Sequence, residues 1–176
     1  MMAQTLTPKS PLPDLDLPLV GGGQFKPTQS DVKDFQILVF YRGLHCPKCK
    51  DHLRDIDSQF KDLSDQGLSL TAISMDSQER AEQTKADWGI EHLPIAYGLG
   101  ILDAKAYGLF LSDKREGSDE PALFSEPAIM VAKPDGALYA QYIQNTPFGR
   151  PPMKDIAAGL AFVKKHDYPT RGTSVA

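Results

Sequence analysis

Apolar residues in the first part of the chain alternate between strand-like runs and helical spacing. Residues 36–41 (QILVFY) are almost continuously apolar and rich in β-formers, which is typical of a strand buried on both faces. After a turn, we expect a helix from Cys46, because proline is favoured at the first helical position and Pro47 stands there. The apolar stripe of this helix would consist of Leu53, Ile56, Phe60 and Leu63.

A second strand and a second helix are predicted next. Gly67 ends the first helix as its C-terminal cap. Residues 68–75 (LSLTAISM) form the strand, and a helix then runs from Asp76, its cap, to about Trp88, with Glu79 placed as in a capping box. This alternation of strands and helices predicts a parallel pair joined by a right-handed crossover.

Shorter elements are predicted in the second half of the chain. In order they are a short edge strand at 93–97, a short helix at 103–107, a polar surface loop at 111–125, a strand at 128–132, a turn at 133–136, an antiparallel partner strand at 137–144 and a closing helix from 153 to about 165. The pattern predicts an α/β protein with a central mixed β-sheet flanked by helices. We divide it into an N-terminal extended arm or hairpin (1–34) packed on the domain, a main domain (35–166) and a loose C-terminal tail (167–176).

Composition and charge narrow the classes of function. The 176 residues are 41% hydrophobic and 24% charged, with a formal net charge of -4. No cluster of Lys and Arg suggests nucleic-acid binding, and no apolar run is long enough to span a membrane. The N-terminus lacks the basic start and apolar core of a secretory signal, so we expect a cytoplasmic location.

The two cysteines, Cys46 and Cys49, lie three positions apart at the predicted helix start. A thiolate there faces unpaired backbone N–H groups and the positive end of the helix dipole, so the pKa of Cys46 should fall below its free value. Lys48 and Lys50 add positive charge nearby. Cys49 lies one turn further on the same face. The spacing therefore predicts a redox pair in which Cys46 is the nucleophile and Cys49 resolves the mixed disulfide.

Two other interpretations of this segment remain open. The cysteines could pack as small hydrophobic side chains. Alternatively, His45, Cys46, Cys49 and His52 offer four ligands for a metal ion, and the protein would then be a non-catalytic module that binds a metal or a partner protein. The redox interpretation requires neither a metal nor an organic cofactor.

Residues 40–49 (FYRGLHCPKC) resemble the active-site segment of peroxiredoxin-like proteins of the alkyl hydroperoxide reductase and thiol-specific antioxidant (AhpC/TSA) superfamily. Residues 11–19, 93–109 and 127–136 are similar, in order, to the family's Pro-rich N-terminal strand, its Leu-Pro and Ala-Tyr-Gly region and its penultimate hairpin. The likeness covers most of residues 8–166. It implies a thioredoxin-like fold and thiol-dependent reduction of peroxides or disulfides.

Four residues are expected to support the site. The resemblance implies that Pro127 is cis and lies against Cys46, as in thioredoxin-like proteins, whereas a trans proline at a strand start is the alternative. Arg42 would bind an anionic substrate or the thiolate, or else be exposed to solvent. Tyr41, at the end of the buried strand, and Pro47, at the helix start, complete the set.

The chain departs from typical peroxiredoxins at two positions. Gly43 stands three residues before the reactive cysteine, where the family has Thr or Ser, and Val39 stands where a proline lies further upstream. Loss of one transition-state donor commonly costs about 10²–10³-fold in rate, so we expect slower peroxide reduction. In the expected cycle, Cys46 attacks a peroxide or a disulfide and Cys49 closes an intramolecular disulfide. A dithiol protein such as thioredoxin, or glutathione, would return the electrons to a monomer or homodimer.

Overall fold

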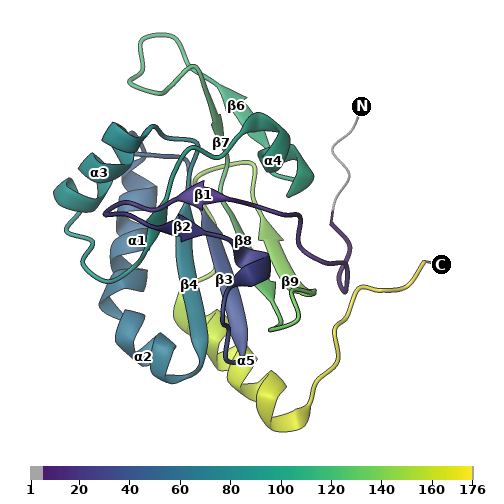
Figure 1. Cartoon of the computed structure of the whole chain (residues 1–176). Helices are drawn as coiled ribbons and strands as arrows, with labels where there is room; N and C mark the ends of the chain where they lie inside the picture. The colour runs from purple at the N-terminus through teal and green to yellow at the C-terminus, as the bar shows by residue number, and fades with distance from the viewer. Residues whose placement is uncertain (1–5, 176) are drawn as a thin grey trace.

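A mixed five-stranded sheet forms the centre of the computed structural model, which describes residues 6–175 (Figure 1). Its strands are β3 (Phe35–Phe40), β4 (Leu68–Ile73), β5 (Ile95–Ala96), β8 (Ala128–Ala132) and β9 (Leu138–Ile143). They lie in the order β5–β4–β3–β8–β9, so the predicted edge strand is at the edge. Residues 1–5 and 176, which belong to the predicted arm and tail, lie outside the described residues.

Strand β3 occupies the middle of the sheet, between β4 and β8, and every one of its six residues is buried there. It runs parallel to β4, with Val39 opposite Ala72, and antiparallel to β8, with Val39 opposite Ile129. The predicted parallel pair and the mixed sheet are therefore confirmed. The carboxyl end of β3 leads directly into the cysteine segment.

Most of the helices cover one face of this sheet. They are α1 (Pro47–Ser58), α2 (Phe60–Asp65), α3 (Gln78–Asp87) and α5 (Met153–His166). Side chains of α1 and α5 such as Leu53 and Leu160 join Ile37 and Val39 of the sheet in one apolar cluster. The single helix expected from Cys46 to Gly67 is divided at Gln59, because the backbone of Gln59 is not helical, with φ -102 and ψ 0.

The N-terminal arm and a short helix cover the opposite face (Figure 1). This layer contains β1 (Leu17–Pro18), β2 (Gln24–Phe25), the 3₁₀ turn η1 (Pro27–Gln29) and α4 (Ile101–Ala106). The Tyr107 hydroxyl, just after α4, donates a 2.8 Å hydrogen bond to the Pro13 carbonyl and ties the arm to the domain. The ring of Tyr107 also packs on that of Phe40, with 5.3 Å between centroids.

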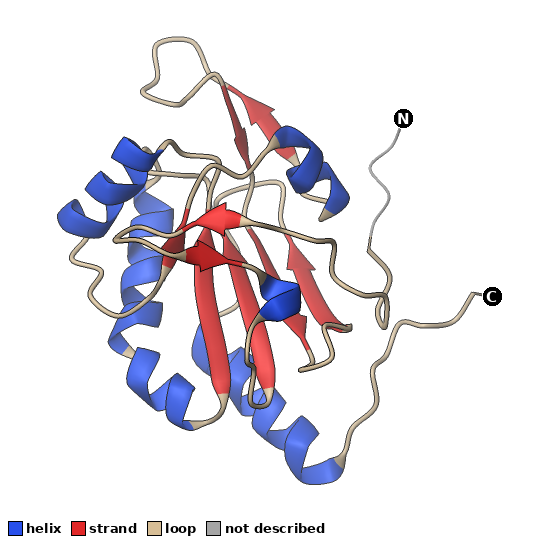
Figure 2. Ribbon diagram, in the orientation of Figure 1, coloured by secondary structure: helices blue, strands red, loops and turns tan. Residues whose placement is uncertain are grey.

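The segment expected to be a polar surface loop contains a second hairpin instead. Strands β6 (Leu111–Asp113) and β7 (Leu123–Ser125) pair antiparallel, and Figure 2 shows this hairpin extending beyond one end of the central sheet. Each strand has three residues, too few for an alternating pattern to stand out against the charged turn between them. The hairpin lies beside the cysteine segment, as the contacts of Arg42 below demonstrate.

The expectation that Pro127 is cis is wrong, because the described residues contain no cis peptide bond. The extended chain around Pro127 is held by two backbone hydrogen bonds. The Glu126 N–H donates to the Phe110 carbonyl over 2.8 Å, and the Pro127 carbonyl accepts from the Gln144 N–H over 3.0 Å. These pairings are satisfied with the ordinary trans geometry, which most X–Pro bonds adopt.

Candidate active site

The cysteine pair lies where β3 ends and α1 begins. Cys46 is the N-cap residue of α1, with extended backbone angles, and Pro47 occupies the first helical turn, as predicted. The backbone N–H of Cys49 donates to the Cys46 sulfur over 3.3 Å, in the manner of a capping side chain. Both cysteines are free thiols. The helix start therefore directs the Cys49 N–H at the Cys46 sulfur.

The two thiols differ in charge at neutral pH. Hydrogen bonding from the Cys49 thiol lowers the pKa of Cys46 to about 5; burial opposes this shift, and the Cys49 N–H, Arg42 and Arg150 reinforce it. Burial raises the pKa of Cys49 well above its ordinary value. Cys46 is only 1% exposed and Cys49 is fully enclosed. The geometry thus provides a thiolate at Cys46 and a protonated thiol beside it.

Arg42 lies on one flank of the pair, held by two buried carboxylates. Its Nη1 is 3.8 Å from the Cys46 sulfur, while Nε lies 3.1 Å from Glu126 and Nη2 3.5 Å from Glu120. The guanidinium also stacks 4.7 Å from the centre of the Phe124 ring. Of the two alternatives for Arg42, the structure gives the one at the site, because its side chain is only 12% exposed.

Glu120 comes from the segment that the sequence pattern assigned to a loop, and Glu126 follows directly after that segment. Glu120 also accepts from the backbone N–H and the side chain of Arg115, and these contacts lower its pKa. Glu126 accepts from the Ser112 hydroxyl over 2.7 Å. Neither glutamate had a motif to reveal it, because only the fold brings residue 120 next to residue 42.

Arg150 lies on the other flank, in the Pro- and Gly-rich segment before α5. Its Nη2 is 3.0 Å from the Cys49 sulfur and 3.9 Å from the Cys46 sulfur. Nε donates to the Pro147 carbonyl over 3.0 Å. No motif in the sequence marks Arg150, and its only local signal is the unusual run PFGRPP at 147–152.

The histidines do not complete a metal site with the cysteines. The His45 ring packs edge-on against Phe124 at 4.7 Å, and His52 Nδ1 lies 3.5 Å from Nη1 of Arg150. Burial and the charge of Arg150 lower the pKa of His52 to about 4. Within residues 6–175, no group of three or more His, Cys, Asp or Glu side chains is arranged to hold a metal ion.

Asp76 shapes the turn before Cys46. Its carboxylate accepts from the Leu44 N–H over 2.8 Å and from Nε of Arg80 over 3.0 Å. Gly43 has φ +129, and a Cβ placed there would lie 2.7 Å from Oδ1 of Asp76. Asp76 was expected to cap α3, but Ser77 is the cap. The aspartate instead occupies the space where the family's Thr or Ser would project.

Tyr41, the remaining predicted supporting residue, lies beneath the site rather than in it. The side chain is fully buried, and its ring meets that of Trp88 edge-on with 6.0 Å between centroids. Burial raises the pKa of Tyr41 far above neutrality. Tyr41 therefore fixes the end of β3 from which the cysteine segment departs.

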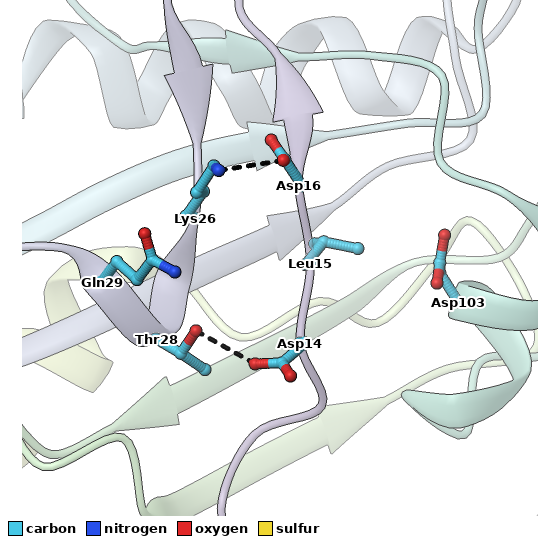
Figure 3. A pocket seen from close by; sticks show the side chains of 7 residues that line it. All are labelled: Asp14, Leu15, Asp16, Lys26, Thr28, Gln29 and Asp103. Carbon is cyan, nitrogen blue, oxygen red and sulfur yellow. Dashed lines mark hydrogen bonds and ion pairs between the residues drawn. The ribbon is translucent and has the colours of Figure 1, made fainter.

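Two hollows of similar size lie at different distances from the chemistry. One, of about 410 Å³, lies between the N-terminal arm and α4, and its polar side chains are already partly paired, as Lys26 with Asp16 and Thr28 with Asp14 (Figure 3). The other, of about 380 Å³, lies between α1 and the 147–152 segment. Only the second includes Arg150, which contacts both sulfurs. The second hollow is therefore the one of the two that lies beside the cysteines.

Peroxiredoxins are among the solved structures with the same fold. A peroxiredoxin-like protein from Aquifex aeolicus superposes with TM-score 0.74 at 13% identity, covering 91% of this chain and 89% of that one. AhpC from Enterococcus faecalis gives 0.73 at 18% identity, covering 96% and 99%. Peroxidoxin BcpB from Mycobacterium tuberculosis gives 0.70 at 16% identity, covering 92% and 98%. No curated protein matches the sequence. At these identities the likeness establishes the thioredoxin-like fold of peroxiredoxins.

The cysteine pair at the helix start and the family to which the sequence belongs together define a thiol-dependent oxidoreductase of the peroxiredoxin type. The sequence profile of the AhpC/TSA family matches residues 8–141, and the chain belongs to this family. No helix in residues 6–175 is long and apolar enough to cross a membrane.

Proposed function

We propose that the protein reduces small hydroperoxides through Cys46 and regenerates the site through Cys49. The observation that carries this proposal is the state of Cys46: its pKa is near 5, yet its side chain is only 1% exposed, between Arg42 and Arg150. A small peroxide needs only a narrow path to such a sulfur. A protein disulfide would require the surrounding segments to move apart first.

The first step of the proposed cycle uses the thiolate and the two guanidinium groups. The Cys46 thiolate attacks the nearer peroxide oxygen, the O–O bond breaks, and the departing oxygen takes a proton to leave as alcohol or water. Cys46 becomes a sulfenic acid. Arg42 and Arg150 offer N–H donors and positive charge toward the departing oxygen, which is where charge develops.

The second step uses Cys49. Its sulfur attacks the Cys46 sulfenic acid, an intramolecular disulfide forms, and the hydroxyl group leaves as water with the Cys49 proton. The 3.3 Å contact between the Cys49 N–H and the Cys46 sulfur supports this assignment, because it places the two residues on one turn of α1. A thiol donor, either a dithiol protein or a small thiol such as glutathione, then restores both cysteines.

The proposed cycle is tested by mass spectrometry after one equivalent of hydrogen peroxide. We expect a monomeric chain lighter by two hydrogens in the wild type, a stable sulfenic acid in Cys49→Ser and no reaction in Cys46→Ser. An intermolecular dimer would contradict the cycle. Stopped-flow rates with hydrogen peroxide and with a protein disulfide, measured on the same preparations, decide which oxidant is the substrate.

Metal content provides the control against the non-catalytic alternative. We expect the purified wild type to titrate two free thiols and to contain no stoichiometric zinc or copper. Stoichiometric metal with loss of free thiols would replace the proposed function by metal binding.

A further inference from the structure

Arg150 is a half-buried cation without a carboxylate partner. Within residues 6–175 its guanidinium forms no ion pair, and its neighbours are the two sulfurs, the Pro147 carbonyl and the ring of His52. The ring of His52 is neutral at physiological pH, since its pKa is about 4. The Cys46 thiolate is therefore the counter-ion of Arg150 in the reduced protein.

Disulfide formation removes that counter-ion. Once Cys46 and Cys49 are joined, neither sulfur carries a charge, and Arg150 remains as an uncompensated cation. A partly desolvated guanidinium without a partner is costly, and it favours a bidentate carboxylate. The oxidised site thus gains affinity for an anion that the reduced site lacks.

The hollow beside Arg150 has the size and charges for a small peptide-like molecule. Its volume of about 380 Å³ lies within the usual range of ligand sites. Arg150 and Lys48 supply positive charge, Asp51 and Asp55 supply negative charge, and the exposed ring of Phe148 supplies an apolar wall. The two cations suit a ligand with two carboxylates, and the two aspartates suit an ammonium group on the same ligand.

We infer that this hollow, the Arg150 cleft, binds the electron donor of the oxidised enzyme, and that the donor is a small peptide-like thiol carrying carboxylates. Arg150 and Lys48 hold the carboxylates and direct the donor's sulfur at Cys46. The inference rests on the proposed function, since it requires the Cys46–Cys49 disulfide.

The proposed regeneration step begins at the Cys46 sulfur, 3.9 Å from Nη2 of Arg150. The donor thiolate attacks the Cys46 sulfur, the Cys46–Cys49 bond breaks, and Cys49 leaves with the electron pair and takes up a proton. A second donor thiolate attacks the donor sulfur of the mixed disulfide and releases the Cys46 thiolate and the donor disulfide. Because a thiol of raised pKa is a poor leaving group, the 3.0 Å contact from Arg150 to the Cys49 sulfur also assists departure.

The test compares a charged and an uncharged donor on the pre-formed disulfide. Oxidised wild type, Arg150→Gln and Lys48→Gln are reduced with glutathione or with 2-mercaptoethanol, and the second-order rate constants are measured. The ratio of the two constants removes any common effect on the departure of Cys49. Arg54→Gln is the matched control, because Arg54 is an exposed arginine on α1, the helix that also carries Lys48.

We expect the glutathione to 2-mercaptoethanol ratio to fall about tenfold in Arg150→Gln and severalfold in Lys48→Gln, with no change in Arg54→Gln. S-Methylglutathione, which cannot react, should bind the oxidised wild type more tightly than the reduced form in calorimetry. Equal ratios in all variants, or reduction only by reduced thioredoxin, would overturn the inference while leaving the peroxidase cycle intact. Failure of the disulfide to form in the wild type would instead overturn the proposed function, and the inference with it.

Discussion

The two arginines that flank the cysteine pair differ in the groups that balance their charge. On the hairpin flank, Arg42 is enclosed with Glu120, Glu126 and Phe124. On the cleft flank, Arg150 approaches the sulfurs from a Pro- and Gly-rich segment, with no carboxylate within ion-pair distance in residues 6–175. One cation is balanced whatever the redox state, whereas the balance of the other depends on Cys46.

This difference separates two tasks. A cation fixed by carboxylates provides a constant environment for the thiolate and stabilises the fold around it. A cation balanced only by the reactive sulfur changes its preferred partner each time the sulfur changes state. This difference can be tested at the Cys46 sulfur, on either flank and at the turn between the flanks.

The largest expected effect is on the reactivity of Cys46, whose sulfur lies near both arginines. The thiolate fraction of Cys46 rises as the pH rises through its pKa of about 5. Alkylation of Cys46 should therefore accelerate about 100-fold between pH 3 and pH 7 and then level off, because only the thiolate reacts. Peptide mapping after iodoacetamide treatment measures this profile. Preferential labelling of Cys49 would reverse the assignment of the nucleophile.

Replacing Arg42 by Met should damage the hairpin flank most. Glu126 would keep a single hydrogen bond, from Ser112, and its charge would be buried without a cation. Removing one partner of a buried pair costs about 3–5 kcal/mol in the free energy of unfolding, which urea titration measures. The double variant with Glu126→Gln should recover part of this loss. A cost as small as that of Arg54→Met would show that the pair is not buried in solution.

At the turn between the flanks, Gly43→Ala is expected to cost about 1–3 kcal/mol in unfolding free energy, since the new Cβ meets Asp76 at an unfavourable φ of +129. Gly22→Ala is the matched control, because Gly22 has a φ of +108 but nothing within 4 Å of the added Cβ. Equal losses in the two variants would show that Asp76 does not restrict the turn.

The smallest effect on stability is expected for Arg150→Met. No carboxylate is left unpaired, so the unfolding free energy should change by less than about 1 kcal/mol. Its charge helps to lower the pKa of Cys46, so the alkylation profile should nevertheless shift to higher pH. A destabilisation as large as that of Arg42→Met would remove the contrast between the flanks.

Features with a local cause could be predicted from the sequence. The helix start at Cys46 and Pro47 depends on a cap and a fixed φ, both encoded within a few residues. The buried strand β3 and the turn after β8 likewise follow from short patterns. The lowered pKa of Cys46 could also be predicted, because the helix start contributes the Cys49 N–H to the contacts that cause it.

Features that depend on residues far apart in the sequence could not be predicted. Glu120 meets Arg42 across 78 positions and Arg150 meets Cys49 across 101 positions, so no spacing marks either contact. At Asp76, a plausible local role as helix cap concealed its long-range bond to the Leu44 N–H. At Pro127, the family resemblance implied a cis peptide bond, and the structure has a trans bond there.

The contact between Gly43 and Asp76 also restricts how this lineage can change. A hydroxyl-bearing residue at position 43 requires space that the aspartate fills, so Thr or Ser cannot arise there first without strain. A shorter side chain at position 76 would have to arise earlier and would leave the Leu44 N–H without its acceptor in the interval. The two positions are thus expected to covary across homologues, with a hydroxyl-bearing residue at position 43 only where position 76 carries a side chain shorter than aspartate.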